Sequence, residues 1–169
     1  TVNLKVAGSS AVDTKTVTAT GFETVTIASD DTATTATGID HAVTLTASSV
    51  TSITLSGDAG VDLTNTATTV TSLDASDLSS TSGGLEWTSG ALAAAATITG
   101  SAGVDVIDAS AATKALTMDG GAGIDTLTGG AGNDIITDTS AAAAGTTSNT
   151  LHGYTGNDTI TGGAGDDVL

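Results

Sequence analysis

The sequence predicts an all-β protein that folds as a right-handed parallel β-solenoid, in which short strands wind into stacked coils. A glycine-rich nonapeptide pattern repeats in the C-terminal third of the chain, and such repeats are typical of parallel β-helices. Earlier segments alternate apolar and polar residues, as half-buried strands do. Phe, Trp, Tyr and Met occur once each, so a conventional globular core cannot form. The abundant Gly, Ala, Ser and Thr instead favour a thin roll around one layer of aliphatic side chains.

The nonapeptide has the form G-G-x-G-x-D-x-U-x, where U is a large aliphatic residue. It occurs as GGAGIDTLT, GGAGNDIIT, GYTGNDTIT and GGAGDDVL, at residues 120–128, 129–137, 153–161 and 162–169. Glycine permits positive φ and close backbone approach, so the first six residues can form a turn that points carbonyl groups at one centre. The aspartates at position 6 add carboxylates to this centre; they are Asp125, Asp134, Asp158 and Asp167. Calcium takes six to eight such oxygen ligands. The residues at position 8 are expected to point inward; they are Leu127, Ile136, Ile160 and Leu169.

Two nonapeptides make one coil, so turns on the same edge lie one coil apart. Asp134 is therefore expected to face Asp158 and not Asp125. The spacing between Asp134 and Asp158 is too long for this, and we place the excess in a looped-out segment at residues 138–143. Residues 144–152 then form a degenerate nonapeptide with Asn149 at position 6 and Leu151 at position 8.

The same register predicts the remaining neighbours. Asp125 faces Asn149, and Asn149 faces Asp167. Residues 111–119 are expected to form a metal-free nonapeptide with Met118 inward, which brings Asp105 opposite Asp125 after a two-residue bulge. Stacked strands lie about 4.8 Å apart, and two carboxylates at that distance repel by roughly 3.5 kcal/mol at an effective dielectric constant of 20. A bridging divalent cation reverses the sign, so the metal-free coils are not expected to close.

The turn pattern fades toward the N-terminus. The segment GSAGVDVID at residues 100–108 keeps its glycines and Asp105. The segment GDAGVDLT at residues 57–64 keeps Asp62 but has Thr64 at the inward position. For the fainter turns that contain Asp13 and Asp40, a solvated aspartate is the better interpretation. We divide the chain into irregular solenoid coils at residues 1–99 and calcium-binding coils at residues 100–169, continuous with one another.

Composition and charge exclude several functions. The chain has 19 acidic residues against three lysines and no arginine, which argues against nucleic-acid and anionic-membrane partners. No signal peptide or membrane-length apolar stretch is present. No serine has a recognisable activating base, so we expect no enzyme activity. The chain lacks an initiator Met and stops within a nonapeptide, so we interpret it as a piece of a larger protein.

Four isolated side chains are assigned structural roles. His41 and His152 are expected to be exposed, and Lys114 to be solvated. Trp87 is expected to fill the roll beside Leu85 and Leu92, with an assembly contact as the alternative. Asn157 and Asp166, at position 5 of their nonapeptides, are expected to lie on the outer rim without binding metal.

The segment from residue 120 to residue 169 resembles the RTX repeats of bacterial proteins exported by type I secretion. The Thr-, Ala- and Ser-rich remainder, with strings such as SLDASDL and GGLEWTSGALAAAATITGSAGVDVIDAS, resembles the body of RTX-type bacterial surface-layer proteins. The resemblance implies a secreted, extracellular structural protein that folds with several Ca²⁺ ions and assembles with copies of itself at the cell surface. It also implies anchoring to a cell-surface polysaccharide through regions outside this chain. The ligands carried over from the family are Asp125, Asp134, Asp158, Asp167, Asp105, Asp62 and Asn149, with carbonyl groups from Gly120, Ala122, Gly129, Ala131, Gly153 and Gly162; Asn149 and Thr64 depart from the pattern.

Two other functions stay open. The repeats could be the calcium-folding segment of a secreted adhesin, toxin or enzyme whose activity lies elsewhere on the parent chain. Thr-x-Thr strings, such as the one at residues 24–26, could instead form an ice-binding face. Any half-buried strand with outward threonines produces the same string, so this pattern has low specificity.

Overall fold

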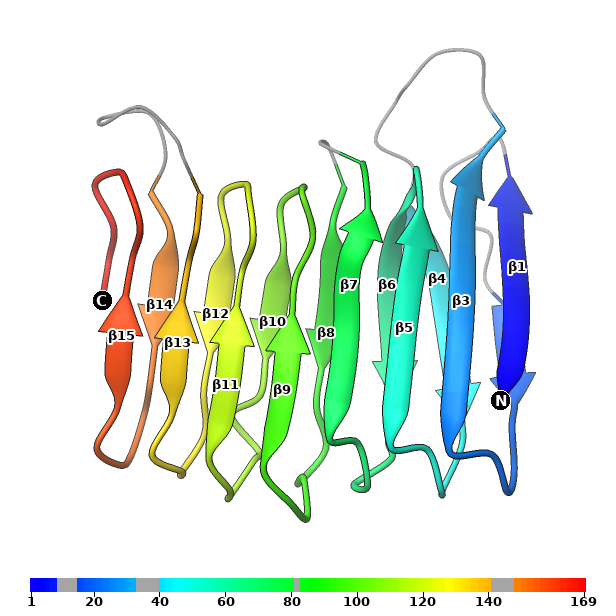
Figure 1. The fold of residues 1–169 in the computed structure, drawn as a ribbon, viewed down its shortest axis with the longest axis horizontal. Helices are drawn as coiled ribbons and strands as arrows, with labels where there is room; N and C mark the ends of the chain where they lie inside the picture. Colours follow the sequence, from blue (N-terminus) through cyan, green and yellow to red (C-terminus); the bar gives the residue numbers. More distant parts are fainter. Residues whose placement is uncertain (9–14, 33–39, 81–82, 141–147) are drawn as a thin grey trace.

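The fold is a flattened roll of two parallel β-sheets, as Figure 1 shows. The computed structural model describes residues 1–8, 15–32, 40–80, 83–140 and 148–169. Within these ranges the chain forms strands and turns and no helix, so no helix there is long and apolar enough to cross a membrane. Odd-numbered strands form an eight-stranded sheet and even-numbered strands form a seven-stranded sheet. The predicted all-β parallel solenoid is confirmed.

The strands have the following bounds. The odd-numbered sheet contains β1 (Val2–Gly8), β3 (Thr24–Asp31), β5 (Ser52–Gly57), β7 (Ser72–Leu78), β9 (Ala96–Thr99), β11 (Leu116–Asp119), β13 (Ile135–Thr137) and β15 (Thr159–Thr161). The even-numbered sheet contains β2 (Lys15–Thr18), β4 (Asp40–Thr46), β6 (Gly60–Asn65), β8 (Leu85–Thr88), β10 (Val106–Asp108), β12 (Thr126–Thr128) and β14 (Thr150–His152). Each coil therefore contributes one strand to each sheet.

Parallel pairing stacks equivalent residues of successive coils directly over one another. Met118 pairs with Ile136, and Ile136 pairs with Ile160. In the other sheet Leu127 pairs with Leu151. Strand β9 pairs with both β7 and β11, so the odd-numbered sheet runs without a break past residue 100.

The core lies between the sheets and consists mainly of aliphatic side chains stacked in columns. Because side chains alternate along a strand, each three-residue strand of the later coils sends only its middle residue inward. Leu127, Ile136 and Leu151 are fully buried, and Ile160 packs against the same cluster. Leu169 is 66% exposed, so its predicted inward position is wrong. The last pairing is an isolated bridge between Thr150 and Val168, and no strand forms around Leu169 to turn it inward.

Two predictions for isolated aromatic side chains have opposite outcomes. Trp87 is 2% exposed in the same core as Leu85 and Leu92, which confirms that it fills the roll. His41 was expected to be exposed and is fully buried, because it alternates in register with Val43 and lies on the inner face of β4. Its Nδ1 atom lies 2.9 Å from the Ser29 hydroxyl oxygen.

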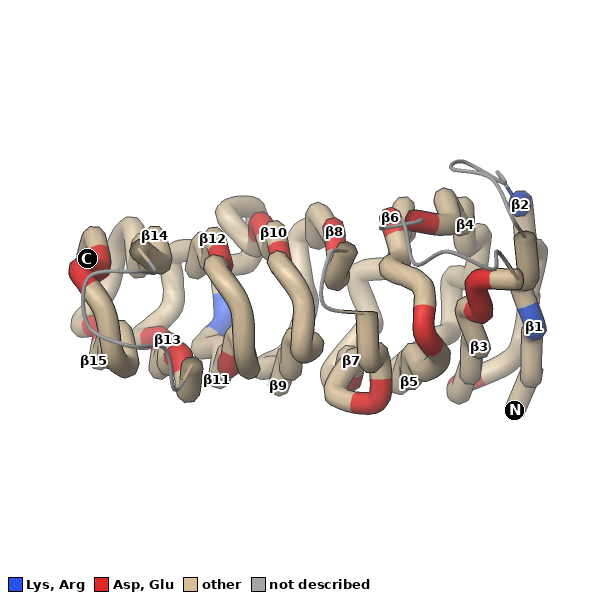
Figure 2. Tube along the Cα trace, turned by 90° about the horizontal axis from the view of Figure 1, so that it is seen from above, with Lys and Arg blue, Asp and Glu red and all other residues tan. Residues whose placement is uncertain are grey.

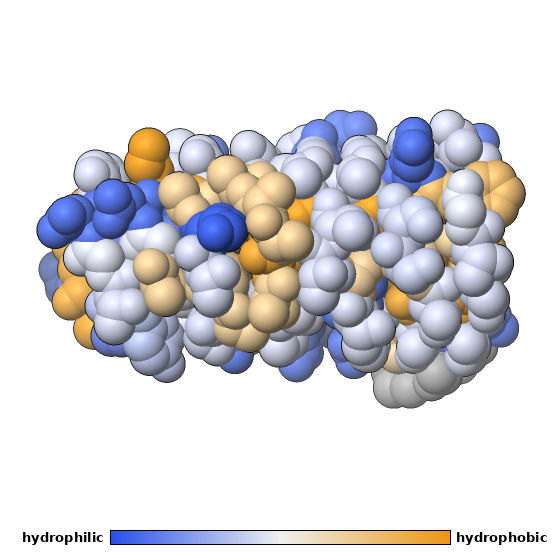
Figure 3. Space-filling view, turned by 90° about the horizontal axis from the view of Figure 1, so that it is seen from below, coloured by the Kyte–Doolittle hydropathy of each residue, from blue (hydrophilic) through white to orange (hydrophobic). Residues whose placement is uncertain are grey.

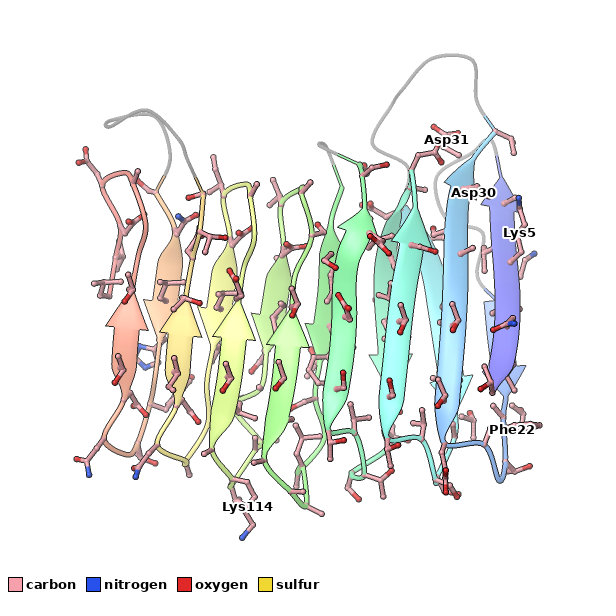
Figure 4. The ribbon with its side chains drawn as sticks, viewed as in Figure 1. Lys5, Phe22, Asp30, Asp31 and Lys114 are labelled. Atoms are coloured by element: carbon pink, nitrogen blue, oxygen red, sulfur yellow. The ribbon has the colours of Figure 1, made fainter. Side chains whose placement is uncertain are left out.

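The surface has few cations. Lys5 on β1 forms an ion pair with Asp30 on β3, with 2.7 Å between Nζ and Oδ2, and Lys114 projects from a lower turn (Figure 4). Lys114 and His152 are exposed, as predicted. The lower edge is a mixture of weakly polar and small apolar surface (Figure 3), to which the exposed alanines of the β8–β9 turn contribute.

Neighbouring isoleucines on β13 provide a direct test of this core. Ile136 is fully buried and Ile135 is 48% exposed. Ile136→Ala is expected to lower the free energy of unfolding in calcium by about 2–5 kcal/mol, because it leaves a cavity in the column. Ile135→Ala is expected to cost less than about 1 kcal/mol. Urea titrations followed by circular dichroism measure both values, and equal costs would show that the assigned register is wrong.

Candidate calcium sites in the stacked turns

The candidate sites lie in two rows of turns along the edges of the roll. The upper turns lead from odd- to even-numbered strands and include residues 100–105, 120–125, 138–140, 148–149 and 162–167. The lower turns lead back and include residues 109–115, 129–134 and 153–158. Figure 2 looks onto the upper turns and shows acidic residues recurring along the whole roll, with few basic ones.

Position-6 side chains form a ladder that links each coil to the one before it. In the upper row the Oδ1 atom of Asp125 accepts a hydrogen bond from the Asp105 amide at 2.9 Å. The Oδ1 atom of Asn149 accepts one from the Asp125 amide at 2.9 Å, and Oδ1 of Asp167 accepts one from the Asn149 amide at 3.0 Å.

The lower row repeats the arrangement. The Asp158 Oδ1 atom accepts a hydrogen bond from the Asp134 amide at 2.8 Å, and Asp134 accepts one from the Leu116 amide at 2.9 Å. Leu116 occupies position 6 of the nonapeptide that was expected to be metal-free, and Met118 of the same repeat is buried as predicted. All four facing pairs inferred from the spacing are therefore confirmed.

The second carboxylate oxygen has a partner within its own turn in two cases. The Asp105 Oδ2 atom accepts a hydrogen bond from the Ser101 amide at 2.7 Å, and the Asp134 Oδ2 atom accepts one from the Gly130 amide at 2.9 Å. The Ser101 hydroxyl also donates to Asp105 Oδ1. In both turns the main-chain amide at position 2 thus donates a hydrogen bond to the carboxylate at position 6.

The turn around Asp125 does not close in this way. Its position-2 residue, Gly121, has φ of 90° and donates its amide to Asp119 instead. Asp125 is 1% exposed, and its Oδ2 atom has no hydrogen-bond partner within the described ranges. A buried, unpaired carboxylate oxygen is costly, so this atom needs a cation or a proton.

The glycines at position 1 make room for the carboxylates. They are Gly120, Gly129, Gly153 and Gly162, and a Cβ atom on any of them would come within 2.6 Å of the Oδ2 atom of its own position-6 aspartate. The carbonyl oxygens of Gly120 and Gly153 face position 1 of the preceding coil, at Gly100 and Gly129. Carboxylate and carbonyl oxygens therefore converge between coils, which fits the oxygen ligands of calcium.

The alanines at position 3 contribute main-chain hydrogen bonds between coils. The Ala122 and Ala131 amides donate to the carbonyl oxygens of Ser101 and Ala112, at 3.0 and 2.9 Å. Metal ligation by the carbonyl groups of Ala122 and Ala131 stays a prediction. No group of three or more His, Cys, Asp or Glu side chains that could hold a metal occurs in the described part of the chain.

The turn expected at residues 57–64 is not formed. Gly57 ends β5 and Gly60 already begins β6, so no six-residue turn separates the strands. Val61 and Leu63 point inward, which places Asp62 and Thr64 on the outer face. The interpretation of this segment as a nonapeptide is wrong. The side chains of a continuous strand alternate between the two faces of the sheet, and Asp62 therefore lies on the outer face and not at position 6 of a turn. Asp40 likewise begins β4, whereas Asp13 lies outside the described residues.

Asn149 keeps its place in the ladder but presents a donor to the turn. Its Nδ2 group donates to the Ser140 hydroxyl oxygen at 3.3 Å and to the Gly162 carbonyl oxygen at 3.4 Å. The aspartates present an acceptor oxygen at the same place. Ligation by Asn149 stays a prediction, and only its Oδ1 atom could serve.

One buried carboxylate escaped the sequence analysis. Asp138 was assigned to the looped-out segment, yet it is 2% exposed and its Oδ2 atom has no hydrogen-bond partner in the described structure. It follows Thr137 directly and so occupies position 1 of the next turn, a register that the sequence could have revealed. Ser140 of the expected looped-out segment is also buried, whereas residues 141–143 of that segment lie outside the described residues.

The electrostatics of the upper row favour a bound positive charge. Burial, together with the nearby Asp105 and Asp138 carboxylates, raises the pKa of Asp125 to about 7. Burial also raises the pKa of Asp105, against the opposing effect of its hydrogen bonds. A divalent cation would remove the cost of holding these carboxylates ionised.

Comparison with known proteins agrees with this geometry. The model of the RTX calcium-binding nonapeptide repeat family matches the chain in four copies, at residues 95–112, 117–137 and 144–169, all in the C-terminal half. Searches of curated proteins and of solved structures found no match.

The raised pKa of Asp125 predicts how the calcium-free protein responds to acid. A carboxyl group whose pKa is raised by folding stabilises the folded state below its ordinary value of 3.8, and this contribution is lost as the pH rises toward about 7. In chelator, the β signal in circular dichroism is therefore expected to increase as the pH falls from 8 to 5. Asp125→Asn is expected to weaken this dependence. A wild-type signal that stays flat or falls would contradict the assignment.

Proposed function

Because the C-terminal half of this chain carries RTX calcium-binding nonapeptide repeats, which bind Ca²⁺, we propose that it is a calcium-dependent, non-catalytic structural module of a bacterial surface layer. RTX repeats indicate a calcium-binding segment of a secreted protein. The surface-layer role and self-assembly extend that inference.

The observation that carries the proposal is the position-6 ladder. Successive coils place aspartates over one another, and main-chain amides from the neighbouring coil satisfy only one oxygen of each. Lys114 is the only lysine or arginine between residues 100 and 169, so the protein supplies almost no countercharge there. Calcium bound between the coils would supply it and so couple metal binding to folding.

The expected affinity suits an extracellular protein. Extracellular calcium modules typically bind with dissociation constants of about 10⁻⁴ to 10⁻³ M. At cytosolic calcium concentrations, which are far lower, the repeats would stay unclosed, and they would fold after export. Type I secretion is the route that the family resemblance implies.

The surface-layer part of the proposal draws on the remainder of the chain. The Thr-, Ala- and Ser-rich sequence outside the nonapeptides forms further coils of the same roll, and the chain is strongly acidic. Divalent cations would offset the repulsion between two such rolls packed side by side. The proposed partners are copies of the same chain and, through other regions, a cell-surface polysaccharide.

The outer face of the odd-numbered sheet does not favour ice binding. Its outward threonine column includes Thr26, Thr54, Thr99, Thr137 and Thr161, but Asp74 and Asp119 interrupt it. A second column is interrupted by Ile135. A regular array of hydroxyl and methyl groups is therefore not maintained along the roll.

Removal of calcium tests the folding part of the proposal. Addition of EDTA at neutral pH is expected to abolish the β circular dichroism of the C-terminal coils, because the stacked carboxylates then repel one another without a cation. Readdition of calcium, with magnesium as the control, is expected to restore the signal. A spectrum that EDTA leaves unchanged would refute calcium-coupled folding.

Assembly needs a separate experiment. Electron micrographs of the purified protein are expected to show ordered sheets with calcium and none with chelator. Sheets that grow equally well in chelator would contradict the mechanism. Calcium-dependent folding without any sheet or filament would instead favour a calcium-folding segment of a secreted adhesin, toxin or enzyme.

A further inference from the structure

Asp138 differs from every residue at the equivalent place in the neighbouring upper turns. It occupies position 1, where the turns before and after it have Gly100, Gly120 and Gly162. A side chain at those glycines would collide with the position-6 aspartate of the same turn, at Asp105, Asp125 and Asp167. A position-1 side chain therefore projects into the space that the position-6 carboxylate fills elsewhere.

The turn that contains Asp138 is also the one that lacks a position-6 aspartate. Asn149 stands there, and its amide nitrogen donates to the Ser140 hydroxyl oxygen. Ser140 in turn donates its main-chain amide to Asp138 Oδ1 at 2.6 Å. The three residues form one connected group, in which the carboxylate comes from position 1 and the amide from position 6.

One carboxylate oxygen of Asp138 has no hydrogen-bond partner among the described residues. This Oδ2 atom is buried, and Asp125 Oδ2 is the only other carboxylate oxygen in that condition in the described ranges. The Asp138 carboxylate also lies near enough to Asp125 to help to raise the pKa of that group. Two consecutive upper turns thus each contain one buried carboxylate oxygen that lacks a hydrogen-bond partner in the described ranges.

We propose that Asp138 is a calcium ligand that takes the place of the carboxylate missing at Asn149, and that it binds one ion jointly with Asp125. This inference rests on the calcium binding proposed above and adds a residue that the nonapeptide pattern does not assign. The main-chain carbonyls of Asp138 and Ser140 face Gly163 in the next coil, so the same segment has oxygen atoms on both sides. Because Asp138 supplies the negative charge that Asn149 lacks, the upper row has the same charge as it would with an aspartate at position 6 of every turn.

Charge exchange between positions 138 and 149 tests the proposal. Calorimetric calcium titrations of the complete chain would compare wild type, Asp138→Asn, and Asp138→Asn combined with Asn149→Asp. Asp138→Asn keeps the Oδ1 atom that accepts from Ser140 but removes the charge, and it is expected to bind one calcium ion fewer than wild type. The double variant returns a carboxylate to position 6 and is expected to restore the lost ion.

Asp108→Asn is the matched control. Asp108 also follows a strand core and accepts a hydrogen bond from the amide two residues on, at Ser110, but it is only half-buried. Its replacement is expected to leave the calcium stoichiometry unchanged. Circular dichroism in saturating calcium shows whether each variant is folded; if Asp138→Asn fails to fold, restored folding in the double variant supports the proposal.

Different results separate the two levels of inference. A wild-type chain that takes up no calcium would overturn the proposed function itself. A wild-type chain that binds calcium, beside an Asp138→Asn variant with the same stoichiometry and affinities, would overturn only the role of Asp138. A double variant that fails to recover the lost ion would also overturn the role of Asp138. If Asp138 and Asp125 only share a proton and bind no calcium, Asp138→Asn will leave calcium uptake unchanged.

Discussion

Stacking of identical turns places like charges over one another, and the rest of this structure depends on how that conflict is resolved. Parallel coils repeat every 4.8 Å or so, which is too close for uncompensated carboxylates in a partly buried site. The main chain resolves half of the problem, because each position-6 side chain accepts a hydrogen bond from the preceding coil. The second carboxylate oxygen accepts a hydrogen bond from the position-2 amide at Asp105 and Asp134, whereas at Asp125 it has no partner among the described residues.

Cations matter more in the later coils because their strands bury less. Strand β3 has eight residues and buries two aliphatic side chains, Val25 and Ile27, whereas β12 has three residues and buries one, Leu127. A buried aliphatic side chain contributes roughly 1.5–3 kcal/mol, so each later strand has less hydrophobic stabilisation with which to oppose charge repulsion. In the function proposed here, the nonapeptides shorten the strands, and calcium supplies the stabilisation that the shorter strands lack.

Spacing alone was enough to predict the register of the later coils. Each nonapeptide fixes one turn and one inward residue, so the pairing of Asp134 with Asp158 and of Asp125 with Asn149 could be counted from the sequence. The prediction failed where another constraint replaced the turn geometry. At Asp62 and His41 the alternation of a continuous strand determined which side chains face inward. Asp138 is buried because it occupies position 1 of a turn, although it was assigned to an inserted segment. The sequence analysis looked only for aspartates at position 6 and therefore missed this residue.

The position of bound ions tests the central claim most directly. A crystal structure of the protein grown in calcium, with anomalous difference maps to identify the metal, is expected to show calcium ions between successive turns, including one beside Asp125 on the upper edge and one between Asp134 and Asp158 on the lower edge. Carboxylate and main-chain carbonyl oxygens should surround each ion. Ordered turns in which those positions hold no metal would contradict the account, because the carboxylates would then be held together by the protein alone.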